Sequence, residues 1–438
     1  MKILRPVMLG LLAGTALAVG LWLGRMPPLA GHSAGLPRLQ NHTLPKNPRR
    51  PPPPVISAEP LVLAPVAPYL SAEERQLLKL KNRLDRHGAK PNEALLRFTS
   101  AEALRAFLAR AEKAGVKLLG QHDGLNIARI GYDQLGQVSA ALGSEAEASE
   151  ITIDPNFIAQ IPDILQKEDR PVGSGAASFE GEGFFKAIGA TGDRSGWGLG
   201  VMVAVVDSGV ENHPTFADHQ VTHVDLVNDG QPFNGHGTAM ASLIGGENWQ
   251  AAGVAPAAQI LDIRVADASG MSDSFTLAQG ITQAADSGAH IINISLGTYG
   301  DSSTVRDAIT YAQSKGAVII AAAGNDATAN QLSFPASIPK VISVGGVDAD
   351  YVQAYFSNSG PGLDLVAPAV GIQSAYGKSY VIIGDGTSQA TALVSGVLAQ
   401  ALASGATTTA SAAEWLKQHA KALSLAPERG GAGVVQVK

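Results

Sequence analysis

The chain of 438 residues contains no cysteine. Disulfide bonds, thiolate metal ligands and a cysteine nucleophile are therefore excluded, although this absence does not identify a cellular compartment. Charged residues make up only 16% of the chain and aromatic residues only 5%, whereas 45% is hydrophobic and 49 residues are glycine. This composition is typical of an α/β protein with a core rich in alanine, glycine and valine, and it excludes a fibrous or disordered chain.

Clustered positive charge is also missing. The net charge is −6 and no dense stretch of lysine and arginine is present, which argues against nucleic acid as a partner. The sequence has no internal repeat, no Walker phosphate-binding loop and no His-Glu zinc-binding pattern. The chemistry of the protein must therefore be sought in other side chains.

The beginning of the chain is typical of an exported protein. Lys2 and Arg5 precede 19 uncharged residues, 6–24, which exceed a usual signal-peptide core and reach the lower limit for a membrane span. We expect residues 1–26 to be a cleaved signal peptide or, as we favour, an uncleaved anchor. The protein would then be secreted, or tethered to a membrane and facing outward. Residues 27–69 form a proline-rich linker, a composition that gives a semi-rigid spacer.

A small α+β domain is predicted next. Residues 70–91 are expected to contain a helix. Residues 92–161 show the order strand, helix, two strands, helix, strand, with a hairpin turn at Asp123-Gly124. Thr99 and Glu102 are expected to cap the first helix of this series. The order is that of a ferredoxin-like unit, which by itself indicates no particular function.

A linker at 162–184 leads to the largest part of the chain, 185–438. Apolar segments such as "VMVAVV", "HIINIS" and "AVIIAAA" alternate with helical segments between residues 201 and 347. Near-continuous apolar strands separated by helices predict a mostly parallel sheet with helices on both faces. Functional groups of such a sheet gather at the carboxyl ends of its strands.

Polar residues follow several of these predicted strands. Asp207 could be a turn residue or the buried carboxylate of an acyl-transfer site. Among ten histidines, His236 opens a run of small residues and is expected to be held rigidly, whereas His213 is expected to be a solvated loop residue. Asn325 could be a turn residue or a donor to a developing oxyanion. Ser388 could cap a helix or be a nucleophile at its N-terminus.

Five segments occur in a fixed order: "VAVVDSGV", "NGHGTAMAS", "IINISLG", "AAAGND" and "GDGTSQATALVSG". Their order and flanking residues resemble the subtilisin-like serine protease family over about residues 185–400. The resemblance implies a subtilisin-like α/β fold and hydrolysis of peptide bonds. It also implies that residues 92–161 are an inhibitory propeptide, removed by self-processing at a site within about 160–190.

The resemblance assigns roles to individual residues. The implied catalytic triad is Asp207, His236 and Ser388, with Asn325 as the oxyanion donor. The implied substrate-binding residues are Ser295, Leu296, Gly297 and Gly324. Peptide or protein substrates and the chain's own propeptide are thus the expected partners. No cofactor is expected to be required, and a structural calcium ion is supported by no motif.

Four positions depart from the family pattern: Ala239, Ala369, Gln389 and Ala392. Gln389 stands where the family usually has methionine, and Ala392 where it usually has proline. None of the four removes a catalytic atom, so they bear on the shape of the cleft more than on the mechanism. Besides a serine endopeptidase, two functions stay open: a processing protease or transpeptidase of narrow specificity, and an inactive pseudoprotease that binds peptides.

Overall fold

The structure is a computed structural model that describes residues 70–143, 148–218 and 220–437. The expected signal peptide or anchor, 1–26, and the proline-rich linker, 27–69, lie outside the described residues. Within the described ranges no helix is long and apolar enough to cross a membrane. The described residues belong to one compact unit.

The N-terminal part of this unit is an α+β domain. After helix α1 (Ala72–Leu84), its elements are β1 (Ala89–Phe98), α2 (Ala101–Lys113), β2 (Lys117–His122), β3 (Ile127–Gly131), α3 (Leu135–Leu142) and β4 (Ile151–Gln160). The strands pair antiparallel in the order β2-β3-β1-β4, which is the ferredoxin-like arrangement that the sequence predicts. The predicted cap of α2 is wrong by one residue, because the hydroxyl of Ser100 accepts the bond from the Ala103 N–H.

The larger domain is built on a parallel sheet, as the sequence predicts, and the structure gives its seven strands in the order β12-β11-β10-β9-β5-β7-β6. These strands are β5 (Met202–Asp207), β6 (Val221–Asp225), β7 (Gln259–Arg264), β9 (Ile291–Ile294), β10 (Val318–Ala322), β11 (Ile342–Val347) and β12 (Leu365–Pro368). Along the chain, β5 is the first strand of this sheet. The strands β6 and β7 lie on one side of β5 and the strands β9 to β12 lie on the other, so the strand order reverses at β5. Ligands of open α/β sheets bind at the carboxyl edge of such a strand, which is where Asp207 lies.

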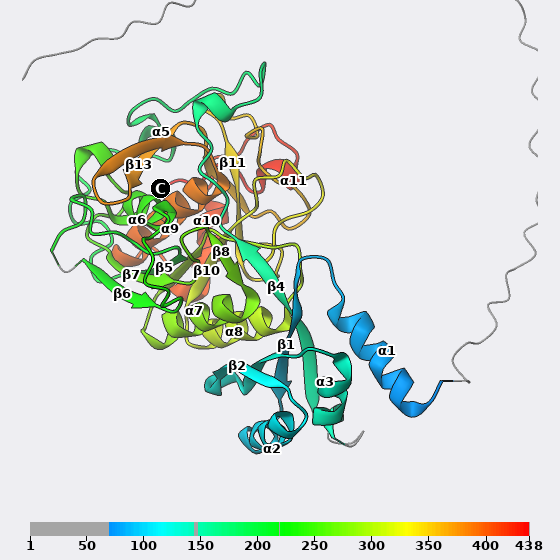
Figure 1. The fold of residues 1–438 in the computed structure, drawn as a ribbon. Helices are drawn as coiled ribbons and strands as arrows, with labels where there is room; N and C mark the ends of the chain where they lie inside the picture. The colour runs from blue at the N-terminus through cyan, green and yellow to red at the C-terminus, as the bar shows by residue number, and fades with distance from the viewer. Residues whose placement is uncertain (1–69, 144–147, 219, 438) are drawn as a thin grey trace, which may run out of the picture. The chain divides into compact units, whose positions relative to one another are not determined.

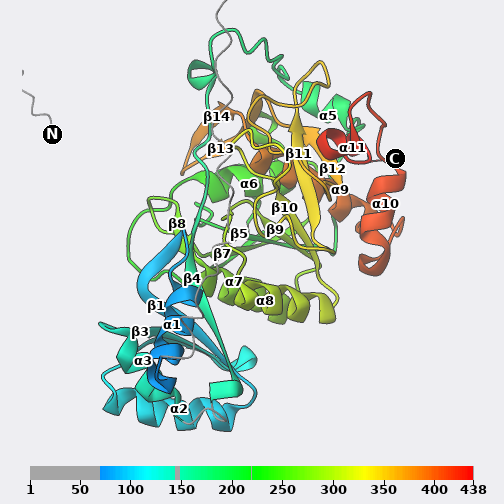
Figure 2. The same ribbon diagram turned by 90° about the vertical axis from the view of Figure 1, so that its right-hand side faces the viewer.

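Helices cover both faces of this sheet (Figures 1 and 2). Side chains alternate along β5: Val203 and Val205 pack in the same cluster as α6 (His236–Gly245) and α9 (Thr387–Ala403). Ala204 and Val206 pack instead with α7 (Ser274–Asp286) and α8 (Ser303–Ser314). The strand is therefore apolar on both sides, which explains its unbroken hydrophobic sequence.

Short elements complete the larger domain. β13 (Ile372–Tyr376) and β14 (Tyr380–Gly384) form an antiparallel hairpin that ends directly before α9. The remaining elements are β8 (Met271–Asp273), α5 (Gly183–Ala187), α10 (Ala412–Gln418) and α11 (Pro427–Gly430).

The strand β4 joins the two domains, and it runs from the small domain into the larger one (Figure 1). Its last residues pair antiparallel with β8, and Gln160 exchanges two backbone hydrogen bonds with Gly297, each of 3.1 Å. The chain continues along the larger domain, where the Asp385 N–H donates to the Leu165 carbonyl at 2.7 Å. Residues 158–160 thus lie against β8 and Gly297, and Leu165 lies against Asp385.

Charged and polar side chains make further contacts between the domains. Asp273, the N-cap residue of α7, accepts hydrogen bonds at its own helix and an ion pair from Lys90 at 2.8 Å. Arg129 approaches the same carboxylate at 3.2 Å. Asp154 of β4 accepts a bond of 2.6 Å from the Ser303 N–H at the start of α8. Carboxylates from both domains therefore occupy the N-termini of α7 and α8, where the helix dipole favours negative charge.

Candidate active site

Asp207 and His236 form a buried pair in the larger domain. Asp207 ends β5 and His236 begins α6. The Nδ1 of His236 lies 2.9 Å and 3.0 Å from the two carboxylate oxygens of Asp207, and the residues are 2% and 0% exposed. A buried carboxylate at Nδ1 selects the tautomer that has its proton there. The second ring nitrogen, Nε2, is then free to accept a proton.

Backbone geometry fixes this pair. The hydroxyl of Ser208 donates to Asp207 at 3.1 Å and accepts from the Gly237 N–H at 3.2 Å, so it links the carboxylate to the first turn of α6. Gly237 has no room for a side chain, because a Cβ there would lie 2.5 Å from the Gly209 carbonyl oxygen. The glycines around His236 in the sequence thus permit close packing of α6 against the end of β5.

Ser388 is the second residue of α9, whose N-cap is Gly386. The prediction that Ser388 could be a helix cap is therefore wrong. Its hydroxyl lies 3.4 Å from the carbonyl oxygen of Ser295, and no hydrogen bond joins it to His236 in the described part of the chain. Ser388 and His236 nevertheless both lie at the beginnings of helices that pack against each other, and both are buried.

Asn325 follows β10 and is held by the first turn of α9. Its side-chain oxygen accepts from the Thr387 N–H at 2.9 Å and from the Thr387 hydroxyl at 2.7 Å. Because the oxygen is occupied in this way, the orientation of the amide is fixed and its NH₂ group remains available as a donor. Gly324 adopts φ +109°, and a side chain there would collide with Asn358.

The predicted substrate-binding residues line a cleft of about 490 Å³. Ser295, Leu296 and Gly297 follow β9, and Gly324 and Asn325 lie in the same cleft. Gln160 and Pro162 also line it, and the pairing of Gln160 with Gly297 shows that this edge accepts an extended backbone. The structure therefore brings the predicted edge together with the end of the N-terminal domain.

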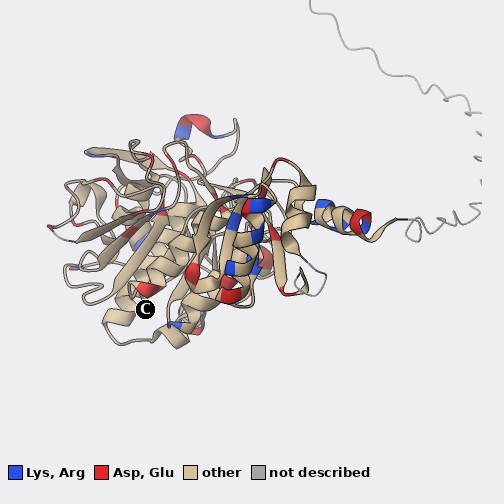
Figure 3. Cartoon of the chain, turned by 60° about the horizontal axis from the view of Figure 1, so that its bottom comes forward, with Lys and Arg blue, Asp and Glu red and all other residues tan. Residues whose placement is uncertain are grey.

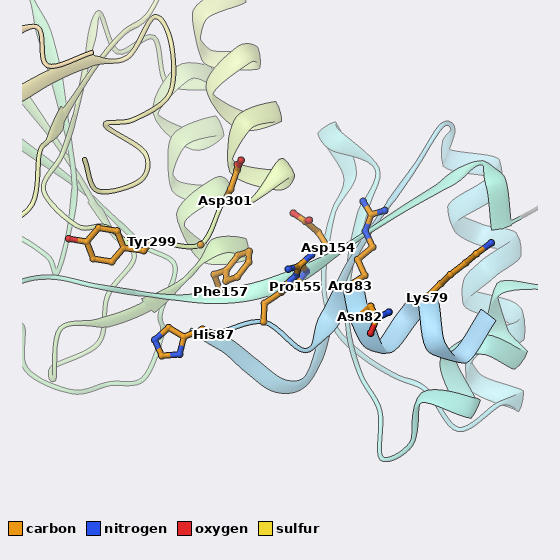
Figure 4. A pocket seen from close by; sticks show the side chains of 11 residues that line it. Lys79, Asn82, Arg83, His87, Asp154, Pro155, Phe157, Tyr299 and Asp301 are labelled. Atoms are coloured by element: carbon orange, nitrogen blue, oxygen red, sulfur yellow. The ribbon is translucent and has the colours of Figure 1, made fainter. Parts of the chain in front are cut away.

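A larger cavity of about 910 Å³ adjoins this cleft and shares His87, Tyr299 and Gly300 with it (Figure 4). Lys79 and Arg83 of α1 line one part of it, and Tyr299 and Asp301 of the larger domain line another. Helix α1, which adjoins the grey trace in Figure 3, also carries acidic residues, so its charge is mixed. Unlike the cleft, this cavity is lined by neither Gly324 nor Asn325, so we do not assign it to the candidate active site.

His213 differs from the prediction of a solvated loop residue. It is only 6% exposed. Its Nδ1 accepts from the Thr215 N–H at 3.1 Å, and its Nε2 lies 3.1 Å from the Tyr380 carbonyl oxygen. Burial lowers the pKa of His213, which is consistent with a neutral, structural histidine. The prediction failed because the β13–β14 hairpin, remote in sequence, covers the loop.

The described residues contain no group of three or more histidine, aspartate or glutamate side chains placed to hold a metal ion. The four departures from the family pattern are all buried, and three of them, Ala239, Ala369 and Ala392, are part of the apolar core. These small residues therefore fill positions in the core and do not supply polar groups to the site.

Sequence reasoning missed several residues that support the site. Ser208 and Thr387 lie inside the quoted motifs, so their proximity to Asp207 and Asn325 could have been suspected. Asp385 also lies inside a motif, but its ion pair with Arg170, 215 positions away, has no local signal.

Comparison with known proteins matches the model of the Subtilase family to residues 198–433, which include every candidate site residue. M-protease from Shouchella clausii (strain KSM-K16) is 33% identical over 314 residues, covering 70% of this chain and 80% of that protein. Thermitase from Thermoactinomyces vulgaris is 41% identical over 207 residues, covering 46% of this chain and 74% of thermitase.

A solved structure shares the fold. Fervidolysin from Fervidobacterium pennivorans, a keratinolytic enzyme related to subtilisin, is similar with a TM-score of 0.65 and 24% identity. The superposition covers 80% of this chain and 61% of fervidolysin. Because residues 198–433 are little more than half of the chain, this likeness extends beyond the segment that the family model matches.

Proposed function

Since this chain belongs to the subtilase family and is a serine-type endopeptidase, we propose that it cleaves peptide bonds through a triad of Asp207, His236 and Ser388. The buried contact of the Asp207 carboxylate with His236 Nδ1 at 2.9 Å is the observation that carries this proposal. It leaves Nε2 to take the proton of Ser388 when the hydroxyl attacks a substrate carbonyl. In the proposed reaction the Ser388 hydroxyl leaves its contact with the Ser295 carbonyl and turns toward Nε2 of His236.

In the next step the tetrahedral intermediate needs donors for its oxyanion. The amide NH₂ of Asn325 supports this role because Thr387 holds the amide oxygen. The N–H of Ser388 is the second donor that we propose, at the N-terminus of a helix of 17 residues. His236 then gives its proton to the leaving amine, and water hydrolyses the acyl-enzyme.

We further propose that the N-terminal domain is the inhibitory propeptide and that the enzyme removes it. Gln160 already occupies the edge at Gly297, and Leu165 pairs with Asp385, three residues before Ser388. The backbone between these two contacts must pass the start of α9. This supports a cut within 161–164, at the N-terminal end of the predicted range. The precursor would be exported, either secreted or anchored through residues 1–26, and the cut would release the mature enzyme, whose substrates would be peptides or proteins.

The test combines a covalent probe with self-processing. We expect a fluorophosphonate to label the mature parent enzyme at Ser388, and N-terminal sequencing to find a start within 162–165. The Ser388→Ala precursor, purified alone, should stay at full length and stay unlabelled. Ser404→Ala, at the exposed C-terminal end of the same helix, is the matched control and should process and label like the parent.

Two results would contradict the proposal. Maturation of the Ser388→Ala precursor when purified alone would exclude self-processing, and labelling of a residue other than Ser388 would exclude the triad. Product analysis with an added amine separates hydrolysis from transpeptidation, because only a transpeptidase forms the new amide bond in quantity.

A further inference from the structure

A buried ion pair connects the segment that follows the cleft to the turn that leads into α9. Arg170 forms two parallel bonds with Asp385: Nε to Oδ2 at 2.7 Å and Nη2 to Oδ1 at 2.8 Å. The two side chains are only 9% and 0% exposed. Such bidentate geometry fixes both the distance and the orientation of the partners.

Asp385 lies in the segment 384–388, which we call the turn; it runs from the last residue of β14 to Ser388 in the first turn of α9. Its Oδ1 also accepts from the Gly371 N–H at 2.8 Å, and its Oδ2 accepts from the Tyr355 hydroxyl at 3.2 Å. Burial and the neighbouring Asp385 raise the pKa of Tyr355 to about 12, so this hydroxyl keeps its proton. Within the described residues Arg170 is the only cation bonded to this carboxylate.

The other side of Arg170 is fixed as well. Its Nη1 donates to the Ser178 hydroxyl at 2.8 Å. Ser178 packs on Gly371, where a Cβ would lie 2.7 Å from the Ser178 Cβ, and the following Phe179 N–H donates to the Val370 carbonyl. Every nitrogen of the guanidinium is therefore engaged, and the group bridges two neighbouring parts of the backbone.

We infer that Arg170 is a positioning residue for the turn 384–388, and so for the hydroxyl and N–H of Ser388. This inference rests on the proposed function, because a cut within 161–164 leaves Arg170 on the mature chain. Removing Arg170 leaves a fully buried carboxylate without its counter-charge, which is strongly unfavourable. Movement of Asp385 toward water would relieve this cost, and Ser388 would then move with it.

Substitution of Arg170 should reduce activity more than substitution of Asp385. In Asp385→Asn the amide oxygen can still accept from Gly371, and Arg170 lies close enough to the surface to reach solvent. In Arg170→Ala a buried charge remains without a cation. Combining the two substitutions removes that charge, so the double variant should behave like Asp385→Asn and not like Arg170→Ala.

The experiment uses mature enzyme prepared from the full-length precursor. For Arg170→Ala we expect kcat and the rate of fluorophosphonate labelling to fall about 10- to 100-fold, since displacement of a reacting group by about 1 Å costs about that much. KM should stay within about twofold of the parent. Arg170→Lys should lie in between, and Arg170→Ala/Asp385→Asn should recover at least half of the loss on a logarithmic scale.

Arg306→Ala is the matched control. Arg306 also forms a bidentate pair, with Asp301, but that pair is exposed, and its removal should leave kcat unchanged. If the Arg170→Ala precursor does not fold, Arg170→Lys and the double variant carry the test.

Three results would overturn the inference: a labelling rate for Arg170→Ala equal to or above that of the parent, a double variant as slow as Arg170→Ala, or a mature N-terminus beyond residue 170. A parent enzyme that is not labelled at Ser388 would instead refute the proposed function, so the two failures can be told apart.

Discussion

Asp207 and Asp273 are two buried carboxylates of the larger domain, and they differ in the domain from which their partners come. Asp207 is bonded by Ser208 and His236, both from the larger domain. Asp273 is paired with Lys90 and Arg129, which belong to the N-terminal domain. Departure of the N-terminal domain would leave the surroundings of Asp207 intact but would remove both cations from Asp273. On our proposal that the N-terminal domain is removed, the residues around Asp207, His236, Asn325 and Ser388 form a permanent site, whereas the contacts of Asp273 form an interface that is lost.

The largest effect is expected from a substitution at the permanent site. Asn325→Ala removes the amide donor that we propose for the oxyanion, and kcat should fall about 10²- to 10³-fold. Because this bond forms in the transition state and not in the ground state, KM should change little. Steady-state kinetics of the mature enzyme on a peptide substrate measures both constants.

Thr387→Val sharpens this prediction. It removes one of the two bonds that orient Asn325 and leaves the backbone bond, so the loss in kcat should be smaller than for Asn325→Ala. A rise in KM with unchanged kcat for Asn325→Ala would show that Asn325 binds the ground state, and the oxyanion role would then be wrong.

The permanent site is also the part that could be predicted from the sequence. The unbroken apolar runs predicted the parallel sheet, and Asp207, His236 and Asn325 lie where strands or helices meet its carboxyl edge. The local sequence pattern is enough to predict the positions of these residues, because the end of a strand fixes where the next residue lies. Sequence patterns could not predict that the Ser388 hydroxyl points toward the Ser295 carbonyl, because the rotamer of a single side chain leaves no pattern in the sequence.

The interface could not be predicted in the same way. Lys90, Arg129 and Asp273 are ordinary charged residues in their own segments, and only the docking of two domains brings them together. The one-residue error at the cap of α2 has another origin, because Thr99 and Ser100 are both good capping residues and only the backbone decides between them. Long-range pairing and exact register are therefore what the sequence leaves open.

An intermediate effect is expected at this interface. Asp273→Asn in the Ser388→Ala precursor keeps a capping oxygen for α7 but loses the charge that attracts Lys90. The free energy of unfolding should fall by about 1.5–3 kcal/mol at neutral pH, the range for hydrogen bonds that involve a charged group. Chemical denaturation of the two precursors measures the difference.

The pH dependence of this difference follows from the pKa of Asp273. Burial alone would raise that pKa, but the bond from Lys90 and the charge of Arg129 outweigh burial, so the pKa lies below its ordinary value of 3.8. A lowered pKa contributes stability that is complete above the ordinary value and is lost as the pH falls through the lowered pKa. The parent and Asp273→Asn curves should therefore be separated above about pH 4 and converge below it.

Asp154 provides a contrast at the same interface. Burial raises its pKa, and the bonds from Ser303 offset this only in part. Its charged form therefore costs stability near neutral pH, and acidification through the raised pKa relieves that cost. Asp193→Asn is the control for an exposed carboxylate, which accepts from the Ser195 N–H, and it should change the curve less than Asp273→Asn does. A separation between the parent and Asp273→Asn curves that persists undiminished below the lowered pKa of Asp273 would contradict the ion-pair explanation.

The smallest effect is expected from Gln389→Met, directly after Ser388 in α9. Gln389 is only 1% exposed, and its Nε2 has no hydrogen-bond partner among the described residues. An unpaired buried amide is unfavourable, so methionine should raise the free energy of unfolding by about 1 kcal/mol, or the midpoint of thermal unfolding by a few degrees. Gln389→Glu, which buries a charge instead, should lower it. A destabilised methionine variant would mean that the amide is bonded after all, and the permanent site would then include Gln389 among its positioning groups.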